Sequence, residues 1–323
     1  MVREEAGDIL EGALLCPERA CQREHPIIDG IAVIVADLRS FAEHQLPALL
    51  QRDDLSAYSE SLLGDAAGPG SVVDAARYQL SSYGRVHWGD LDPDEPLPAG
   101  DGIAALAGAA LALLPEPPSG AWLDLGCSLG RTTFELAGRT GDLALGVDLN
   151  IAMLRAARRV LRDGRAVYPH RRVGVVYDRK ELAVSPPAAE RVDFWACDVQ
   201  QLPLPDGVAA GALALNLVDC VSHPFALLHE IGRVAGRALL STPYDWSTNA
   251  TPFENWLGGH SQRGDQRGSS AAELRRLLGA DAPEGAPPLR ITAERDGVPW
   301  KVVVHERAVM HYQVHLLALA ARR

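Results

Sequence analysis

The sequence predicts an α/β fold in which a mostly parallel sheet has helices on both faces, and three observations point to this class. After Ser119, short apolar runs alternate with segments long enough for a helix, which is the pattern of strands buried under crossover helices. A glycine-containing loop directly follows the first apolar run. An aspartate, Asp148, ends the second run. Together these features predict a Rossmann-like binding fold that begins near residue 119.

The expected strands follow one another along the second half of the chain. Five parallel strands are expected near residues 122–125, 144–147, 192–196, 212–216 and 238–241, with helices between them. Residues 302–304 and 312–320 would add the last, antiparallel strands, which makes a sheet of seven. The segment 173–190 is longer than an ordinary connection and predicts a small hairpin. Residues 103–114 form the most apolar run and predict a buried helix.

Three segments are expected along the chain. Residues 119–323 form the predicted α/β domain, in which the long loop 242–270 faces the substrate. Residues 41–118 are helical and loop-rich, with Gly- and Pro-rich interruptions, and predict a helical lid ahead of that domain. Tyr83 lies in an aromatic cluster of this segment, which either packs the lid or covers the cofactor and the acceptor. Residues 1–40 form a small extension whose sequence pattern differs from that of the following segments.

The extension combines two cysteines with a predicted turn between short strands. Cys16-Pro17 and Cys21 precede the run 25–34, in which Asp29-Gly30 favours a tight turn. This run resembles the small zinc-ribbon-like domain of methyltransferase activator proteins. The two cysteines have four residues between them and no second pair follows, so we expect a degenerate ribbon without metal. His25 is either a third ligand or an ordinary surface histidine.

The overall charge limits the class of partner. The chain has 31 Lys and Arg against 42 Asp and Glu, and its net charge is -11. This balance argues against a broad surface for nucleic acid or anionic lipid and favours a small-molecule or peptide acceptor. No run approaches the about 20 apolar residues that span a membrane, and the first residues do not form a secretory signal. We therefore expect a cytoplasmic protein with free thiols and no membrane partner.

The glycine loop runs from Asp124 through Gly126, Cys127 and Gly130. It follows a predicted strand and opens a helix, where free backbone N–H groups and missing side chains let a ligand approach closely. In dehydrogenases the corresponding loop binds a pyrophosphate. Here the carboxylate of Asp124 would repel a pyrophosphate but would suit an ammonium group. The loop therefore points away from a dinucleotide.

Three further polar positions follow at the ends of later strands. Asp148, followed by Leu149, ends the second strand, where its carboxylate can accept both hydroxyls of a ribose. Asp198 and Val199 follow the third strand, and Asn216 ends the fourth.

These pieces, in this order, resemble the class I S-adenosylmethionine-dependent methyltransferase family over residues 119–242. The resemblance implies S-adenosylmethionine as the cofactor. It also implies which residues contact the cofactor: Asp124, Gly126, Cys127, Gly130, Asp148, Leu149, Asp198, Val199 and Asn216.

The segment after the fifth strand suggests a narrower likeness. Residues 241–259 contain Pro-Tyr-x-Trp, then Thr-Pro, and then Trp-Leu-Gly-Gly. Together with Asp219, they resemble the methyltransferase domain of ovothiol-forming enzymes, which methylate the imidazole of 4-mercaptohistidine. Here Thr242 is inserted before the Pro-Tyr pair, and Ser247, Thr248 and Asn249 replace the usual acidic residues. The sulfoxide-synthase part of those enzymes is absent.

The likeness predicts which residues handle the acceptor. Tyr83, Tyr244, Trp246 and Trp256 would line its pocket, where ring faces can hold a cation. Asp219 or Tyr244 would bond the far imidazole nitrogen and act in catalysis. Imidazole has a pKa of about 6.5 and is largely neutral at pH 7, so a weak proton acceptor is sufficient. Methyl transfer requires no metal. The alternative is that these aromatic residues only pack the loop.

The predicted function is therefore methyl transfer to the imidazole of a histidine-like small molecule or peptide residue. Three other functions stay open. The first is an O-, C- or S-methyltransferase of another metabolite. The second is a protein or RNA methyltransferase, and the third is a non-catalytic regulator that binds the cofactor. Fold alone does not choose among them.

Overall fold

The computed structural model describes residues 3–5, 8–20, 23–28, 31–35, 39, 55–98, 100–114, 116–263 and 267–322. The chain divides into two compact units. The first contains Met1–Ser82, Tyr168–Lys180 and Val303–Val309, and the second contains Tyr83–Val167, Glu181–Val302 and Met310–Arg323. All the residues predicted to bind cofactor or acceptor belong to the second unit.

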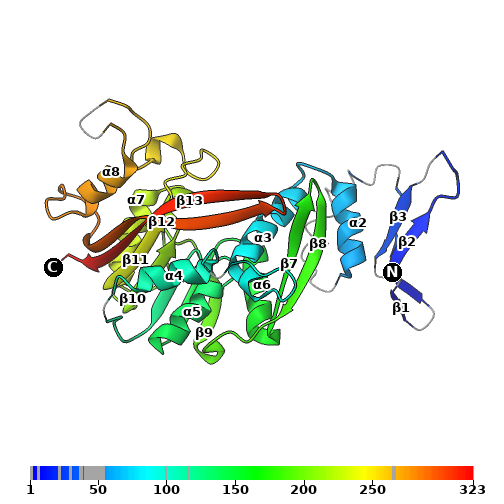
Figure 1. Ribbon diagram of the computed structural model, residues 1–323, viewed down its shortest axis with the longest axis horizontal. Coiled ribbons are helices and arrows are strands. Elements are labelled where there is room, and N and C mark those ends of the chain that lie inside the picture. Colours follow the sequence, from blue (N-terminus) through cyan, green and yellow to red (C-terminus); the bar gives the residue numbers. More distant parts are fainter. Residues whose placement is uncertain are drawn as a thin grey trace. The chain divides into compact units, whose positions relative to one another are not determined.

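A seven-stranded sheet forms the centre of the second unit, in the order β12-β13-β11-β10-β5-β6-β9 (Figure 1). Neighbouring strands from β11 to β9 pair in parallel, and β13 pairs antiparallel to β11. The strand bounds are β5 Trp122–Leu125, β6 Ala144–Asp148, β9 Val192–Ala196, β10 Gly211–Leu215, β11 Arg237–Thr242, β12 Leu289–His305 and β13 Ala308–Ala321. The predicted fold class, a mostly parallel seven-stranded sheet, is confirmed.

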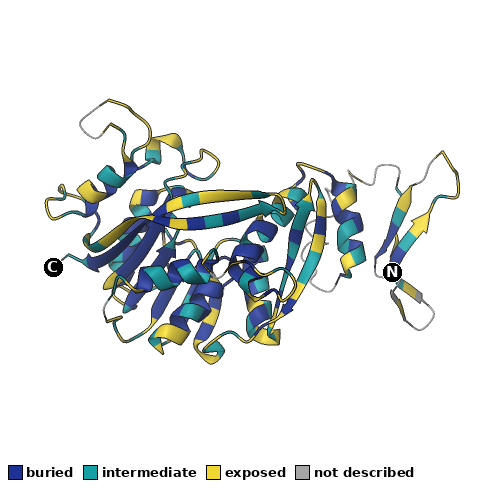
Figure 2. Cartoon of the chain, in the orientation of Figure 1, coloured by how far each residue is buried: buried dark blue, intermediate teal, exposed yellow. Residues whose placement is uncertain are grey.

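Helices cover both faces of this sheet because successive strand residues point to opposite sides. On one face, Leu123 and Leu125 join the core formed with helices α7 (Pro224–Val234) and α8 (Ser270–Leu278). On the other face, Phe194 packs against Phe134 of α5 (Arg131–Thr140), and its ring lies close to Gly130 and to Ala157 of α6 (Ile151–Asp163). Figure 2 shows the buried positions concentrated along the central strands.

Several short elements connect these layers. Helix α4 (Ile103–Leu111) confirms the predicted buried helix. Short 3-10 helices occur at η1 (Gly89–Leu91), η2 (Ala189–Arg191), η3 (Val218–Cys220) and η4 (Phe253–Asn255). Helix α6 begins where the Asn150 side chain accepts hydrogen bonds from the N–H groups of Ala152 and Met153. None of the described helices is both long and apolar enough to cross a membrane.

Two predicted element boundaries differ from the structure. The hairpin expected within 173–190 consists of β7 (Arg165–Val173) and β8 (Val176–Ala183), and so begins earlier. Gly164, with φ of 64°, ends α6 in a left-handed turn, and the chain enters β7 at once. Strand β12 begins at Leu289 rather than near residue 302. Its first half alternates in burial, so it forms no continuous apolar run that would have marked it as a strand.

The first unit contains a four-stranded antiparallel sheet of β1 (Arg3–Glu5), β2 (Asp8–Leu15), β3 (Glu24–Ile28) and β4 (Ile31–Ala32). Strands β3 and β4 flank Asp29-Gly30, as predicted, although those two residues lie outside the described residues. Helix α2 (Ala57–Ala67) also belongs to this unit, and helix α3 spans Val72–Trp88.

The predicted metal-free state of the ribbon-like segment stays a prediction. Cys16 is a free thiol, and Cys21 lies outside the described residues. Nδ1 of His25 lies 3.3 Å from the carbonyl oxygen of Val33, so this ring contacts backbone. Within the described ranges, no three His, Cys, Asp or Glu side chains come together as metal ligands.

Candidate functional site

The candidate site lies where the parallel strands β5, β6, β10 and β11 reach their carboxyl ends. Loops that follow such ends gather at one edge of a sheet and commonly bind ligands there. Five non-glycine residues of the described chain have positive φ, and three of them fall in these loops: Ser128 (51°), Asn216 (51°) and Tyr244 (59°). Each such conformation costs about 1 kcal/mol or more and concentrates at functional sites. The backbone strain therefore points to the same edge as the sequence motifs.

The glycine loop follows β5, and its two predicted glycines have different roles. Gly126 has φ of 73°, which lets the chain turn as it leaves the strand. Gly130 has φ of 79°, and a Cβ there would lie 2.6 Å from Cζ of Phe194 and 2.8 Å from Cβ of Ala157. Gly130 thus allows α5 to pack closely on the sheet. Cys127, which belongs to the loop, is fully buried.

Asp124 lies at the base of this loop and is almost fully buried. Its Oδ2 accepts hydrogen bonds of 2.6 Å from the hydroxyls of both Thr132 and Thr133, which fixes the start of α5. Burial raises the pKa of this carboxyl to about 6, the two hydroxyl bonds oppose the increase, and the charge of Asp148 adds to it. A cationic ligand nearby would stabilise the ionised form.

Asp148 ends β6 and fastens the glycine loop to that strand. Its Oδ2 accepts the N–H of Ser128 at 2.9 Å, and its Oδ1 accepts the N–H of Asn150 at 2.8 Å. Each carboxylate oxygen can accept a second hydrogen bond, so the pair suits a diol. Leu149 beside it is 65% exposed, which leaves an apolar surface next to the carboxylate.

Asp198 and Val199 follow β9 and differ in exposure. Val199 is buried in the core, whereas Asp198 is exposed. Oδ1 of Asp198 accepts hydrogen bonds from the backbone N–H and the side-chain amide of Gln200, at 2.9 and 3.0 Å. The structure therefore leaves Oδ2 of Asp198 outside these two bonds.

Asn216 contributes a buried donor that lacks an acceptor. Its Oδ1 accepts the hydroxyl of Ser241 at 2.7 Å, which fixes the orientation of the amide. Nδ2 is buried and has no hydrogen-bond partner in the described part of the chain. A buried unsatisfied donor costs about 1–3 kcal/mol, so a bound acceptor group would stabilise this residue. This observation is the clearest sign of a missing ligand at the edge.

Helix α3 supports the glycine loop from behind. Trp88 is buried and donates its indole N–H to the carbonyl oxygen of Leu129 at 3.2 Å. Nδ1 of His87 accepts the N–H of Arg131 at 3.3 Å, at the first residue of α5. Burial, aided by the Arg131 charge, lowers the pKa of His87 to about 3, so the ring is neutral. Both side chains therefore bond the backbone at the start of α5 and the end of the glycine loop.

Asp219, a predicted catalytic residue, is buried and holds the loop after β11. Its Oδ1 accepts the hydroxyl of Thr242 at 3.1 Å, and its Oδ2 accepts the N–H of Asp245 at 2.7 Å. Burial raises the pKa of this carboxyl. Asp219 is almost fully buried, whereas Tyr244 is half-buried, so the geometry favours Tyr244 over Asp219 as the residue that meets an acceptor.

The aromatic residues predicted to line the acceptor pocket are distributed unevenly. Trp246 and Trp256 stack on each other at 6.0 Å and 18°, and their indole N–H groups bond the Ser270 hydroxyl and the Thr251 carbonyl. These contacts hold the loop together. Tyr83 on α3 is half-buried. Burial and the bonded Asp245 raise the pKa of the Tyr312 phenol, and Tyr83 adds to this increase.

Sequence reasoning missed the partners of Tyr244. The phenol oxygen of Tyr244 lies 2.6 Å from Nδ1 of His315, and Nε2 of His315 lies 3.0 Å from Glu294. Glu294 lies in the first half of β12, which the sequence did not predict as a strand. A histidine placed among the apolar residues 314–320 was the available signal.

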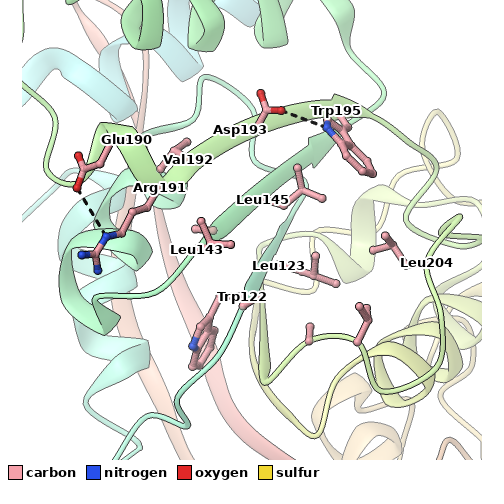
Figure 3. Close-up of a pocket in the computed structure, with 14 residues that line it drawn as sticks. Trp122, Leu123, Leu143, Leu145, Glu190, Arg191, Val192, Asp193, Trp195 and Leu204 are labelled. Carbon is pink, nitrogen blue, oxygen red and sulfur yellow. Dashed lines mark hydrogen bonds and ion pairs between the residues drawn. The ribbon is translucent and has the colours of Figure 1, made fainter.

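A separate hollow of about 460 Å³ lies away from these loops (Figure 3). It is lined by Ala121, Trp122, Leu123, Leu143, Ala144, Leu145, Glu190, Arg191, Val192, Asp193, Trp195, Leu204, Val208 and Ala209. None of the predicted site residues lines it. Many of its residues come from the beginnings of β5, β6 and β9, whereas ligands of such sheets bind at the carboxyl ends. We therefore do not assign this hollow to the candidate site.

Comparisons with known proteins agree with the fold. Residues 123–237 match the family described as "Methyltransferase domain". A curated relative, trans-aconitate 2-methyltransferase of Rhizobium meliloti (strain 1021), is 33% identical over 132 residues, which are 37% of this chain and 47% of the relative. The chain thus spans about half the length of the curated relative that it matches.

Solved structures are similar at low identity. The cyclase SpnF has a TM-score of 0.47 and 14% identity, covering 81% of this chain and 96% of its own. A geranyl diphosphate methyltransferase in complex with S-adenosylmethionine has a TM-score of 0.42 and 16% identity, covering 68% and 85%.

Proposed function

We propose that residues 123–237, which match the family described as "Methyltransferase domain", use S-adenosylmethionine, and that the protein transfers a methyl group to an imidazole nitrogen of a histidine-like small molecule or peptide residue. The cofactor supplies an electrophilic methyl group on a sulfonium. The observation that carries the proposal is the phenol of Tyr244, which lies at the carboxyl end of β11 and is bonded to a histidine. It offers a hydrogen-bonding group for the acceptor beside the strands that hold the cofactor.

The residues at the edge of the sheet fit this cofactor. The unsatisfied Nδ2 of Asn216 suits a carboxylate or carbonyl oxygen, and the carboxylate of Asp148 suits the ribose hydroxyls. The buried charge of Asp124 suits a cationic methionine moiety. Asp198, Val199 and Leu149 are proposed to surround the adenine, where Leu149 offers exposed apolar surface.

For this reaction the acceptor site must position the imidazole and provide a group that accepts its proton. Neutral imidazole has a lone pair on one nitrogen and an N–H on the other, so methylation must be followed by loss of one proton. Tyr244 is proposed to bond that N–H. Asp219 holds the loop that presents Tyr244, because it bonds Thr242 and Asp245 on either side.

A second candidate is methylation of a carboxylate metabolite. The curated relative is named for trans-aconitate, and the likeness extends over 132 residues. Methyl transfer to a carboxylate oxygen releases no proton, so it would not use Tyr244 as an acceptor of protons. The protein or RNA methyltransferase and the non-catalytic regulator are outcomes of the same test.

The test measures transfer from labelled S-adenosylmethionine to histidine, thiol-histidine, histidine-containing peptides, trans-aconitate and an RNA pool, followed by mapping of the methyl position. The proposal expects incorporation on an imidazole nitrogen. Transfer to trans-aconitate alone would replace it with the second candidate, and cofactor binding without any transfer would favour a regulator.

A binding arm checks the cofactor site independently of the acceptor. The Asp148→Asn variant should bind S-adenosylmethionine at least roughly tenfold more weakly by calorimetry, because one acceptor for a hydroxyl is lost. Asp163→Asn, on the exposed end of α6, is the matched control and should bind as the wild type does. Equal affinity of both variants would remove Asp148 from the site.

A further inference from the structure

A continuous chain of hydrogen bonds runs behind Tyr244. The phenol oxygen lies 2.6 Å from Nδ1 of His315 on β13, and Nε2 of His315 lies 3.0 Å from Oε2 of Glu294 on β12. Glu294 in turn accepts two bonds from Nε of Arg275 on α8, at 3.2 and 3.0 Å. His315 has no exposed surface and lies opposite Thr242 in the β11–β13 pairing. The sheet itself therefore holds the imidazole at the edge where Tyr244 lies.

The charges of this chain determine where each proton lies. Although burial raises the pKa of the Glu294 carboxyl, bonds from Arg275 and His315 outweigh burial and lower that pKa. Glu294 is therefore an acceptor at neutral pH, and Nε2 of His315 must carry a proton to bond it. In the tautomer that carries its proton on Nε2 alone, Nδ1 is an acceptor, and the Tyr244 hydroxyl donates to it. The remaining lone pairs of the phenol oxygen stay available to another donor.

We propose that His315 and Glu294 form a proton relay that makes Tyr244 the proton acceptor for the methylated group. This inference rests on the proposed function. As the acceptor nitrogen forms its bond to the methyl carbon, the bond from that carbon to sulfur breaks, and the acceptor gives its N–H proton to the Tyr244 oxygen. The Tyr244 hydroxyl proton moves to Nδ1 of His315, and the resulting imidazolium is stabilised by the Glu294 carboxylate. His315 and Glu294 act through Tyr244 and are positioning residues.

The groups around Tyr244 explain why such a relay would be needed. Burial raises the pKa of this phenol, and the charges of Asp296, Glu294 and Asp219 raise it further, while Arg275 opposes them. A free phenolate is therefore scarce at neutral pH. A histidine that takes the phenolic proton only during the reaction avoids the cost of that phenolate.

Other charged and hydrogen-bonding groups lie near Tyr244 and Glu294. Arg275 also faces Asp296 at 3.8 Å, so it neutralises part of the negative charge on β12. Asp245 follows Tyr244 in the chain and accepts the hydroxyl of Tyr312 at 2.8 Å. Tyr312 has no histidine behind its hydroxyl among the contacts of the described chain, which makes it the matched control for Tyr244.

The activity test compares pH profiles of the variants Tyr244→Phe, His315→Asn and Glu294→Gln. At about pH 7 each should lower kcat by roughly 10²-fold, with an unchanged KM for S-adenosylmethionine, because general base catalysis is lost. The deficit should shrink as the pH rises towards about 9, because solvent base then takes the proton. Tyr312→Phe should cause a small loss that is the same at every pH. A pH-independent loss in the relay variants would mean a structural role and would overturn the proposal.

A second readout does not depend on turnover. Nitrogen NMR of the protein without cofactor should show His315 protonated on Nε2 and unprotonated on Nδ1, with Nδ1 shifted in Tyr244→Phe and unshifted in Tyr312→Phe. A ring protonated on Nδ1 would overturn the relay even if the variants lose activity. If the wild-type protein methylates no imidazole, the proposed function fails instead. The tautomer of His315 still decides whether the hydrogen bonds of the relay have the proposed donors and acceptors.

Discussion

Asp124 combines two features that seldom occur together in one residue, an ionisable group and almost complete burial. Thr132 and Thr133 both bond its Oδ2, so the carboxyl has a structural task at the start of α5. Burial nevertheless raises its pKa to about 6. Between about pH 4 and pH 6 the carboxyl is therefore mostly protonated in the native protein but mostly ionised in the unfolded chain, where its pKa is 3.8.

Replacement of Asp124 by Asn should change how stability depends on pH. A raised native pKa means that the stability from this group is fully present below about pH 4 and is lost as the pH rises through about 6. The loss approaches ~3 kcal/mol at pH 7, at about 1.4 kcal/mol per pH unit. Asp124→Asn lacks this loss, so its free energy of unfolding should fall less between pH 4 and pH 7 than that of the wild type. Denaturant titrations across this range measure the difference, and parallel pH curves for the two proteins would contradict it.

Individual site residues were predictable from the sequence where a local pattern fixes them. Asp124, Gly126 and Asp148 are tied to the ends of strands by the chain itself, and the structure places them together at the carboxyl edge. The Tyr244–His315 contact was not predictable, because it joins residues that are 71 positions apart. Only the pairing of β11 with β13 brings them together, and no local spacing encodes that register.

At the scale of elements, the contact between α5 and the sheet depends on a glycine. A Cβ on Gly130 would overlap the ring of Phe194 and Cβ of Ala157, both of which come from packed elements. The position also requires φ of 79°. Two separate costs therefore apply to any side chain there.

Gly130→Ala should destabilise the protein by about 2–4 kcal/mol, the sum of overpacking and an unfavourable φ. Gly207→Ala is the matched control, because Gly207 has φ of 63° but no atom lies within 4 Å of the place that a Cβ would take. That variant should cost only about 1 kcal/mol, the backbone part alone. Thermal and denaturant unfolding separate the two costs. Equal losses would show that Phe194 and Ala157 give way without penalty.

The predicted bounds of the strands were accurate where at least one face of the strand is buried. Strands β5 and β9 have the predicted bounds because they are short apolar runs between turns. The first half of β12 was missed, because a solvated antiparallel strand carries charged residues such as Glu294 and Asp296. Its position is set by pairing within the sheet rather than by its own composition.

At the scale of the whole molecule, the charge distribution bears on the choice of partner. With 42 acidic against 31 basic side chains, the mean field of the protein repels polyanions. Several arginines, moreover, are paired with carboxylates, including Arg233 with Glu230 and Arg158 with Asp193. These paired cations are less available to neutralise phosphates.

The protein should therefore show no binding to an RNA pool in a filter assay at about 0.15 M salt. Lowering the salt tenfold should produce at most weak retention, because the net charge of -11 opposes it. Retention at physiological salt that falls steeply as salt is added would contradict this expectation and would reopen the RNA methyltransferase function.

The order of strands in the sheet also has a consequence during synthesis. Strand β13, at residues 308–321, lies between β11 and β12, and both of these are translated before it. While the ribosome is still adding residues before 308, β11 has no partner on one side, and the apolar residues that β13 later covers stay exposed. The nascent chain must therefore keep the sheet open at β11 until β13 has emerged, and Tyr244 meets His315 only then.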